Sequence, residues 1–547
     1  MSTEFLGKTV SGPFTIPSGI VTTAPSIIQR IIDRVPAVGV ITTKSIGAEP
    51  RLGYREPVYS EYAPGCFVNA VGLTNPGVEA ARAGLASLNI PDDRFLLVSI
   101  FGGSVDEFVA VAQALESVSD GLELNLSCPH AKGYGMAMGQ DPDMVRDIVS
   151  AVCSAVNIPV IAKLTPNVDD ITAIGRAALE GGAAGLCAIN TAGPGYTSSH
   201  GHPVLSNEVG GLSGKGVLPI TLKALRALRA ETDKPLIGCG GLSTAEDCRS
   251  ALACGANIVG IGSGLTGMDS AVIEHYFEAL EIDLNSGSNS AESLLHHDAN
   301  MAFKPFTISD NARICEDINV LTLDGDLPIR AGEYVFVWIP GVGEKPFSCL
   351  TDSPVRLAVI DVGVFTSHSC QLAVGDTVYL RGPYGVAVAP PKGRQVVCVA
   401  GGTGLAAVYQ IARDFGQPNT PAEIFMGARS ANRLYFREEC EQIARVTVAT
   451  DDGSLGFHGR VSEALAAFLA NLPQGDIEQL VFYNCGPEPM IHGAEAVQRQ
   501  YVGPDRIHSA IDYLTKCGVG ICGACAAPDG RRICVDGPFI TAERPAA

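Results

Sequence analysis

The sequence has few basic residues and no long apolar stretch. It holds 38 Lys and Arg residues against 58 Asp and Glu residues, so its formal net charge is −20. Because nucleic-acid phosphates are bound by clustered basic side chains, this balance argues against nucleic acid as a partner. No apolar run approaches the roughly 18 residues of a membrane span, and the opening MSTEFLGKTV lacks the apolar core of a secretory signal. We therefore expect a cytoplasmic protein with no membrane span.

The length predicts several domains, and most of the cysteines are predicted to be buried thiols. A chain of 547 residues is too long for one hydrophobic core, and domains of ~100–200 residues predict three or four units. Most of the 17 cysteines stand singly in apolar surroundings, as Cys153, Cys187, Cys239 and Cys398 do. Without an export signal these are expected to be buried thiols and not disulfides. Five other cysteines stand in more distinctive surroundings.

The first half of the chain alternates short apolar runs with amphipathic helical stretches. Eight such steps in ~250 residues favour a (β/α)₈ TIM barrel over an open doubly wound sheet. Nearly all of the runs are apolar throughout, as expected of parallel strands that are buried on both faces. The predicted strands are residues 14–19, 38–44, 96–102, 122–127, 159–164, 185–190, 235–241 and 257–263.

The second half changes character after a polar segment rich in Ser and Asn. We interpret residues 285–300 as a linker that follows a barrel of residues 1–284. Residues 301–392 are rich in strands and turn signals, which favours a small antiparallel β-barrel. Residues 393–504 return to alternating strands and helices, and residues 505–547 are short and rich in cysteine.

Polar residues stand at the predicted C-terminal ends of several barrel strands, where the active sites of such barrels lie. They are Lys44, Asn125 with Cys128, Lys163, and Asn190 with Thr191. The last two strands end instead in Gly240-Gly241 and Gly262-Ser263, which suits a phosphate bound by backbone N–H groups. The alternatives are tight turns for the glycines, a structural thiol for Cys128 and a solvated lysine for Lys163.

These residues lie in ordered motifs that resemble the class 1 dihydroorotate dehydrogenases over most of residues 5–280. The most specific are TTKSIGAEPRLG (42–53), FVNAVGLTNPG (67–77), LELNLSCPH (122–130), IAKLTPNV (161–168) and IGCGGLSTAED (237–247). The resemblance implies that Cys128 is the base and that Lys163 stabilises charge on a reduced FMN. It also implies two sets of binding residues. Substrate would contact Lys44, Asn69, Gly72, Leu73, Asn125, His130, Asn190 and Thr191, and FMN would contact Ser18, Gly19, Lys44, Ser45, Asn125, Lys163, Gly214, Gly240, Gly241, Gly262 and Ser263.

His130 departs from this family, which usually has Asn at that position. The stretch LNLSCPHAKGYGMAMGQDP (124–142) also resembles dihydropyrimidine dehydrogenases, which use the same barrel on uracil or thymine. Against that alternative stand FVNAVGLTNPG and the absence from the sequence of dense CxxC runs for [4Fe–4S] clusters. Dihydroorotate is therefore the favoured substrate, with a related dihydropyrimidine as the alternative.

The tail carries four cysteines with the spacing C-x4-C-x2-C followed by a distal cysteine. Cys517, Cys522, Cys525 and Cys534 stand in a Gly-rich stretch, and this spacing is that of plant-type [2Fe–2S] ligands. Soft thiolates suit iron–sulfur clusters, and the glycines allow backbone N–H groups to approach the sulfides. A zinc site is the alternative, but the spacing fits paired CxxC knuckles poorly.

Residues ~300–540 resemble the ferredoxin-reductase-like electron-transfer subunit of NAD-linked dihydroorotate dehydrogenases. The resemblance implies FAD contacts by Lys345, Pro346, Phe347 and Ser348, and by Gly363 and Thr366. The turn Gly401-Gly402-Thr403-Gly404 follows a predicted strand and opens a helix, as at a dinucleotide pyrophosphate, although alone it could be only a turn. Asp451 and Cys485-Gly486-Pro487 would complete the NAD contacts. No basic cluster adjoins Asp451-Asp452, so NAD is favoured over NADP.

Together the modules predict an NAD-linked dihydroorotate dehydrogenase in one polypeptide, with FMN, a [2Fe–2S] cluster and FAD, acting in pyrimidine biosynthesis. The cluster would carry electrons between the two flavins. Because the related barrels dimerise, we expect a homodimer through the barrel. The alternatives are a reductase of another unsaturated ring, and a tail that delivers electrons to a separate protein.

Overall fold

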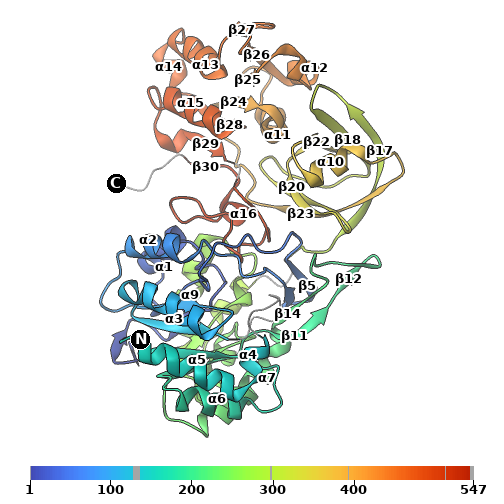
Figure 1. Ribbon diagram of the computed structural model, residues 1–547. Coiled ribbons are helices and arrows are strands. Elements are labelled where there is room, and N and C mark those ends of the chain that lie inside the picture. The colour runs from blue at the N-terminus through green and yellow to red at the C-terminus, as the bar shows by residue number, and fades with distance from the viewer. Residues whose placement is uncertain (1, 127–135, 296–298, 392, 512, 542–547) are drawn as a thin grey trace. The chain divides into compact units, whose positions relative to one another are not determined.

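The computed structural model describes residues 2–126, 136–295, 299–391, 393–511 and 513–541 (Figure 1). The chain divides into two compact units. Unit 1 consists of Met1–Ala299 and Val519–Arg532, and unit 2 of Asn300–Gly518 and Ile533–Ala547. The middle of the cysteine-rich tail therefore belongs to the same unit as the predicted barrel.

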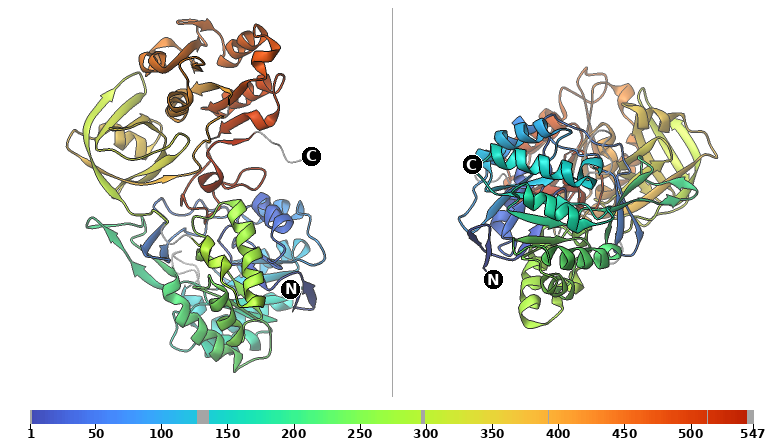
Figure 2. Two further views of the ribbon diagram at one scale, coloured as in Figure 1. Left: turned by 180° about the vertical axis from the view of Figure 1, so that it is seen from behind. Right: turned by 60° about the horizontal axis from the view of Figure 1, so that its bottom comes forward.

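Unit 1 is built on a closed barrel of eight parallel strands, which confirms the predicted fold (Figure 2). Each of the eight predicted runs supplies one strand. They are β3 (Phe14–Ile16), β4 (Val40–Thr42), β7 (Phe95–Ile100), β8 (Gly121–Asn125), β9 (Val160–Leu164), β10 (Gly185–Ala188), β15 (Leu236–Cys239) and β16 (Ile258–Gly260). The helices are α1 (Pro25–Arg34), α2 (Val78–Ala86), α3 (Val105–Leu115), α4 (Met136–Gln140), α5 (Pro142–Ala155), α6 (Ile171–Glu180), α7 (Leu218–Arg229), α8 (Ala245–Ala253) and α9 (Ser270–Ser286).

Helix α5 shows how the sequence specifies these helices. Its buried residues Val145, Ile148, Val149 and Val152 recur at a spacing of three and four, so they lie on one face. The carboxylate of Asp141 accepts hydrogen bonds from the first free backbone N–H groups, and Pro142 occupies the first helical position. The residues of the helix therefore determine where it begins and which of its faces is buried.

A second sheet in unit 1 is formed by segments that follow β4 and β10. Its strand order is β11 (Ala192–Tyr196), β14 (Val209–Gly214), β6 (Cys66–Asn69) and β5 (Tyr59–Ala63), all antiparallel. Asn69 at the end of β6 pairs with Gly211 of β14, and its side chain donates to the Gly211 carbonyl at 3.1 Å. This sheet adds residues to the cavity described below. Two short hairpins, β1 (Thr3–Phe5) with β2 (Lys8–Val10) and β12 (Ser198–Ser199) with β13 (His202–Pro203), are the other strands among the described residues of unit 1.

The tail segment Val519–Arg532 is hydrogen-bonded to barrel loops within unit 1. The Val21 N–H donates to the Ile521 carbonyl at 2.8 Å. The guanidinium of Arg532, which is fully buried, donates to the carbonyls of Gly520 at 2.8 Å and Met268 at 2.9 Å. Val21 and Met268 follow strands β3 and β16, so this segment of the tail joins the barrel at the C-terminal ends of two strands.

Part of the predicted linker is regular structure. Helix α9 extends to Ser286, and a 3₁₀ turn covers Ser290–Leu294. The buried carboxylate of Asp283 accepts hydrogen bonds from the Ser288 and Ser290 hydroxyls and from the Ala291 N–H. The first part of the segment is thereby folded back onto α9. The finer division of the chain at residues 285, 301, 393 and 505 stays a prediction.

Unit 2 begins with an antiparallel half-barrel of seven strands and one helix. The strand order is β20 (Gly343–Phe347), β19 (Tyr334–Ile339), β23 (Thr377–Tyr384), β17 (Lys304–Arg313), β18 (Ile318–Asp324), β22 (Val355–Ile360) and β21 (Cys349–Asp352). Helix α10 (Val364–Gln371) follows β22. An apolar cluster that includes Ile308, Leu323 and Val335 fills its core.

A mostly parallel sheet forms the rest of unit 2. Its order is β27 (Phe457–His458), β26 (Ala444–Thr450), β25 (Ala422–Ala428), β24 (Gln395–Gly401), β28 (Leu480–Cys485), β29 (Ile507–Ala510) and β30 (Ile540–Thr541), with β30 antiparallel. The helices are α11 (Leu405–Phe415), α12 (Arg437–Ile443), α13 (Val461–Ala470), α14 (Gln474–Ile477), α15 (Glu488–Gln498) and α16 (Ile533–Asp536). In neither unit does a described helix combine the length and apolarity needed to cross a membrane.

Candidate active site

A cavity of about 180 Å³ lies at the C-terminal ends of the barrel strands. It gathers residues from the ends of seven of the eight barrel strands and from the second sheet. Nearly all of the predicted substrate and FMN residues that are described line it: Ser18, Gly19, Lys44, Ser45, Asn69, Gly72, Leu73, Asn125, Lys163, Asn190, Thr191, Gly240, Gly241, Gly262 and Ser263. Their proximity is a property of the fold, and their individual roles stay predictions. Cys128 and His130 lie outside the described residues.

The ends of the two glycine-ended strands line this cavity. Gly240 and Gly241 have φ values of +124° and +79°, which side-chain-bearing residues rarely adopt. A Cβ atom on Gly241 would lie 2.8 Å from the Gly214 carbonyl, and Gly214 with Gly241 and Ser263 lines an adjoining hollow. Only glycine fits here, as expected where backbone approaches a phosphate.

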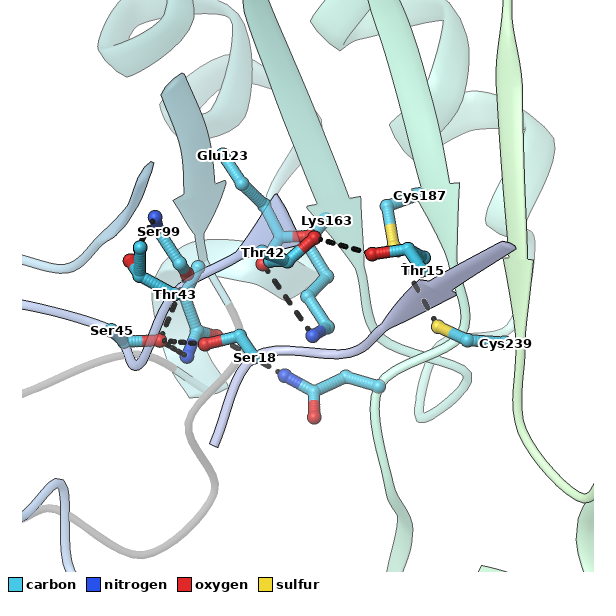
Figure 3. Close-up of polar contacts among 12 residues, drawn as sticks. Thr15, Ser18, Thr42, Thr43, Ser45, Ser99, Glu123, Lys163, Cys187 and Cys239 are labelled. Carbon is cyan, nitrogen blue, oxygen red and sulfur yellow. Dashed lines mark hydrogen bonds and ion pairs between the residues drawn. The ribbon is translucent and has the colours of Figure 1, made fainter. Parts of the chain in front are cut away.

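A chain of hydrogen bonds, which runs through Ser18, Ser45 and Ser99 in Figure 3, fixes two of the asparagines of the cavity. The hydroxyl of Ser45 lies 2.9 Å from those of Ser18 and Ser99, and it accepts from the Asn125 amide at 3.0 Å. The carbonyl oxygen of Asn125 in turn accepts from the Asn190 amide at 3.1 Å. Because every link is partly or fully buried, the amide groups keep one orientation.

Lys163 is the buried cation of the cavity. Its side chain is 6% exposed, and its Nζ lies 3.5 Å from the Glu123 carboxylate, whose side chain is 2% exposed. Burial by itself would lower the pKa of Lys163. The Glu123 carboxylate, together with the Cys187 and Cys239 thiols, outweighs that effect, so the pKa of Lys163 is raised and the ammonium stays charged.

Two thiols lie beside this ion pair, from strands β10 and β15. The sulfur atoms of Cys187 and Cys239 are 3.6 Å apart, and both residues are buried. The hydrogen bond from Cys187, with Lys163 nearby, lowers the pKa of Cys239, whereas the same hydrogen bond and burial raise the pKa of Cys187. Both are buried as predicted, and so is Cys398, whereas Cys153 is only half-buried.

Several residues in and beside this site were not predicted from the sequence, and Glu123 is the most informative. It stands in the strand LELNLS two positions before Asn125, so both side chains point to the same face of the strand. A carboxylate in an otherwise apolar strand at that spacing was the available signal. Tyr59 and Leu212, which line the cavity, had no such signal because their strands belong to the second sheet.

The two predicted FAD segments lie together in unit 2. The Phe347 ring of β20 is 6.2 Å from the Phe365 ring of α10, which brings Lys345-Pro346-Phe347-Ser348 beside Gly363 and Thr366. The Thr366 hydroxyl accepts hydrogen bonds from the N–H groups of Val362 and Gly363, so it fixes the start of α10. Contact of these segments with FAD stays a prediction.

The predicted NAD segments meet where the strand order of the parallel sheet reverses. Gly401 ends β24 and Cys485 ends the neighbouring β28, while β25 and β26 lie on the other side of β24. Such a reversal leaves a crevice at the carboxyl ends of the strands, where dinucleotides bind in open α/β sheets. Asp451 directly follows β26 at the same edge.

Gly404 is expected to tolerate no side chain. A Cβ atom on it would lie 2.2 Å from the Cys485 carbonyl oxygen, so Gly404→Ala must displace the turn against Cys485-Gly486-Pro487. We expect the KM for NADH in dye reduction to rise about 10- to 100-fold, since small displacements at a binding site have effects of that size. Gly475→Ala is the matched control, because nothing lies within 4 Å of its Cβ position. An unchanged KM in the Gly404 variant would contradict the assignment.

The four tail cysteines are all buried, with exposures of 1% for Cys517, 8% for Cys522, 2% for Cys525 and 1% for Cys534. Gly518, Gly520 and Gly523 between them have positive φ values, so the segment follows a path that needs glycine. Within the described ranges, no group of three or more His, Cys, Asp or Glu side chains has the arrangement of a metal site. The donor set suits a cluster chemically, and the ligand assignment stays a prediction.

Comparison with known proteins decides the family. Residues 1–284, just over half of the chain, match the family described as dihydroorotate dehydrogenase. The chain belongs to the dihydroorotate dehydrogenase family. Residues 398–496 match the oxidoreductase NAD-binding domain, and residues 514–544 match the iron–sulfur cluster binding domain of dihydroorotate dehydrogenase B. This member of the family is thus an oxidoreductase that joins a catalytic barrel to NAD-binding and iron–sulfur domains.

Curated relatives of the barrel carry the name "dihydroorotate dehydrogenase B (NAD(+)), catalytic subunit". The protein from Pyrococcus horikoshii is 45% identical over 270 residues, which are 48% of this chain and 86% of the relative. That from Thermococcus kodakarensis is 41% identical over 297 residues, or 54% of this chain and 97% of the relative. That from Methanocaldococcus jannaschii is 42% identical over 270 residues, or 48% and 87%. Each of these matches covers about half of this chain and most of the relative.

Proposed function

We propose that the protein oxidises dihydroorotate to orotate and passes the electrons to NAD⁺, a reaction of pyrimidine biosynthesis. The family match over residues 1–284 carries this proposal, because the same residues enclose the cavity with the buried Lys163. The NAD-binding and iron–sulfur domains in the same chain support NAD⁺ as the acceptor. Orotate chemistry therefore explains both halves of the polypeptide.

The proposed cofactors are FMN in the barrel cavity, FAD at the segments of unit 2 described above, and a [2Fe–2S] cluster on the tail cysteines. The glycine cradle of Gly240 and Gly241 and the buried Lys163 ammonium suit the phosphate and the electron-rich ring edge of FMN. When bound, FMN supplies the hydride acceptor, and the cluster and FAD supply the carriers that lead to NAD⁺.

The residues of the chain would bind and orient the ring and move one proton. A planar dihydropyrimidine has paired N–H and C=O groups on its edges, and the amides of Asn125 and Asn190 match both kinds of group. Their hydrogen bonds to each other and to Ser45 hold them ready for the ring. Lys163 keeps a positive charge in the cavity, and Cys128 would take the proton from the carbon next to the one that loses hydride.

Three further properties belong to this proposal. The cofactor is NAD and not NADP, supported by the lack of a basic cluster beside Asp451 and Asp452 in the sequence. A homodimer through the barrel follows from the resemblance of the barrel to dimeric relatives. The third is a cytoplasmic location, as expected in the sequence analysis.

The proposal is tested by anaerobic titration of the purified protein, after its FMN, FAD and iron have been quantified. Dihydroorotate is expected to bleach the flavin absorbance and, with NAD⁺, to yield NADH in equal amount. Dihydrouracil and dihydrothymine, and NADP⁺ in place of NAD⁺, are expected to react far more slowly. Faster bleaching by dihydrouracil would instead support a dihydropyrimidine dehydrogenase, the alternative that His130 raises.

A further inference from the structure

Strand β8 carries a carboxylate into the interior of the barrel. Glu123 is 1% exposed, and its side chain points to the same face of the strand as Asn125, which lines the cavity. Asn125 is the register partner of Lys163 on β9, and Glu123 is the partner of Ile161. Glu123 therefore lies one layer deeper in the barrel than Lys163.

The surroundings of Glu123 give it little solvation. Its partner Ile161 belongs to an apolar cluster in the barrel interior that includes Phe95 and Leu97. The Oε1 atom of Glu123 has no hydrogen-bond partner among the residues that the structure describes. A carboxylate in such a place destabilises the fold unless a positive charge faces it.

The Lys163 ammonium provides that charge, with its Nζ 3.5 Å from Oε1 (Figure 3). Two other titratable groups face Lys163, the thiols of Cys187 on β10 and Cys239 on β15. Lys44 lines the same cavity from beyond β4. Among these groups, Glu123 is the carboxylate that compensates the ammonium.

We propose that Glu123 is a positioning residue of the active site, whose buried carboxylate holds the Lys163 ammonium as a permanent positive charge in the cavity wall. The inference rests on the proposed function, because it is the bound flavin that would use this charge. Glu123 itself does not line the cavity, so it acts through Lys163.

The charge of Lys163 depends on a balance between burial and pairing. Burial disfavours the charged form of a lysine and lowers its pKa, and the nearby carboxylate reverses this for Lys163. Without the carboxylate the effect of burial, which lowers the pKa of Lys163, would be opposed only by the two thiols, each with a smaller influence than Glu123. The ammonium would then lose its proton at a lower pH, and the cavity would lose its fixed charge.

The test uses the holoenzyme with Glu123→Gln, which keeps the shape of the side chain and removes its charge. The midpoint potential of the barrel flavin is measured against pH by titration with mediator dyes, without dihydroorotate. In the wild type we expect the midpoint potential to vary smoothly with pH, without a break, between about pH 6 and pH 9. In E123Q we expect an additional break, above which the potential falls to that of Lys163→Met. A curve identical to that of the wild type would overturn the inference.

Steady-state kinetics provide a second readout. Above the break, kcat of E123Q for dihydroorotate should fall about tenfold or more, and it should recover at lower pH. KM should change by less than about threefold, because Asn125 and Asn190 hold the ring and keep their partners. Glu123→Asp, which keeps the charge, should show no break in the potential. A uniform rise in KM with a pH-independent kcat would mean that Glu123 only shapes the cavity.

A double variant covers the case in which E123Q does not fold. Glu123→Leu with Lys163→Met removes both charges together, so it should fold and bind flavin with the potential of Lys163→Met alone. A potential that differs from that of Lys163→Met would show that Glu123 acts by another route, and would overturn the inference. Because the potentials are measured without substrate, failure of dihydroorotate as a reductant would contradict the proposed function and leave this test valid.

Discussion

Replacement of Cys128 by alanine is expected to stop the oxidation of dihydroorotate and to leave NADH-driven dye reduction intact. Cys128 follows Asn125 by three residues, and Asn125 ends β8 and lines the cavity. A cysteine has an ordinary pKa of about 8.5, so it can accept a proton near working pH. Loss of a general base typically costs about 10²–10⁴-fold in rate, and we expect kcat to fall by that amount.

The measurement is the rate of flavin bleaching after anaerobic mixing with dihydroorotate. Cys153→Ala is the control, since Cys153 lies on α5 away from the cavity lining and should leave the rate unchanged. FMN content must be equal in the two variants. A rate for Cys128→Ala within about twofold of the wild type would show that another group takes the proton.

Replacement of Cys522 by serine is expected to separate the two half-reactions. The side chain is buried in the tail segment Val519–Arg532, which belongs to the barrel unit. A serine hydroxyl is a poor substitute for a thiolate on iron. Loss of an outer-shell partner already costs about 10–100-fold in metal affinity, so loss of a direct ligand should cost more. Dihydroorotate should still bleach the barrel flavin, whereas NADH formation should cease.

Three assays check this prediction: dihydroorotate-driven bleaching, NADH-driven dye reduction, and NADH formation from dihydroorotate. The third alone should be lost, together with iron and acid-labile sulfide. Cys254→Ser, at the end of α8, is the control and should keep all three activities. NADH formation at the wild-type rate in a Cys522 variant without cluster iron would refute the proposed route.

The barrel was predictable because each of its strands can be recognised from its own short stretch of sequence. Strands such as β8 and β9 are buried on both faces, so the sequence shows short apolar runs at regular spacing. The antiparallel half-barrel and the NAD-binding sheet were predictable for the same reason, from a change in strand pattern after residue 300. The order of pairing in the half-barrel, where β23 lies between β19 and β17, depends on contacts far apart in the chain and leaves no local pattern.

The candidate site was predictable where strand ends carry polar residues. In a parallel barrel all C-terminal ends meet on one side, so Lys163 and Asn190 had to lie near each other once the barrel was recognised. Glu123 was overlooked because it lies one layer below that edge. The residues of the second sheet, such as Tyr59, entered the cavity through antiparallel pairing, which strand-end reasoning does not cover.

By itself the sequence determined the chemistry that the chain can hold: thiol ligands at cluster spacing, glycines at phosphate turns, and amides and a lysine at strand ends. These are properties of neighbouring residues, so they can be read locally. Only the tertiary structure decided which charges face each other, as Glu123 and Lys163 do. It also decided that the Val21 N–H of the barrel donates a hydrogen bond to the Ile521 carbonyl of the tail. Burial and pairing across the chain arise from packing, and packing is a property of the whole fold.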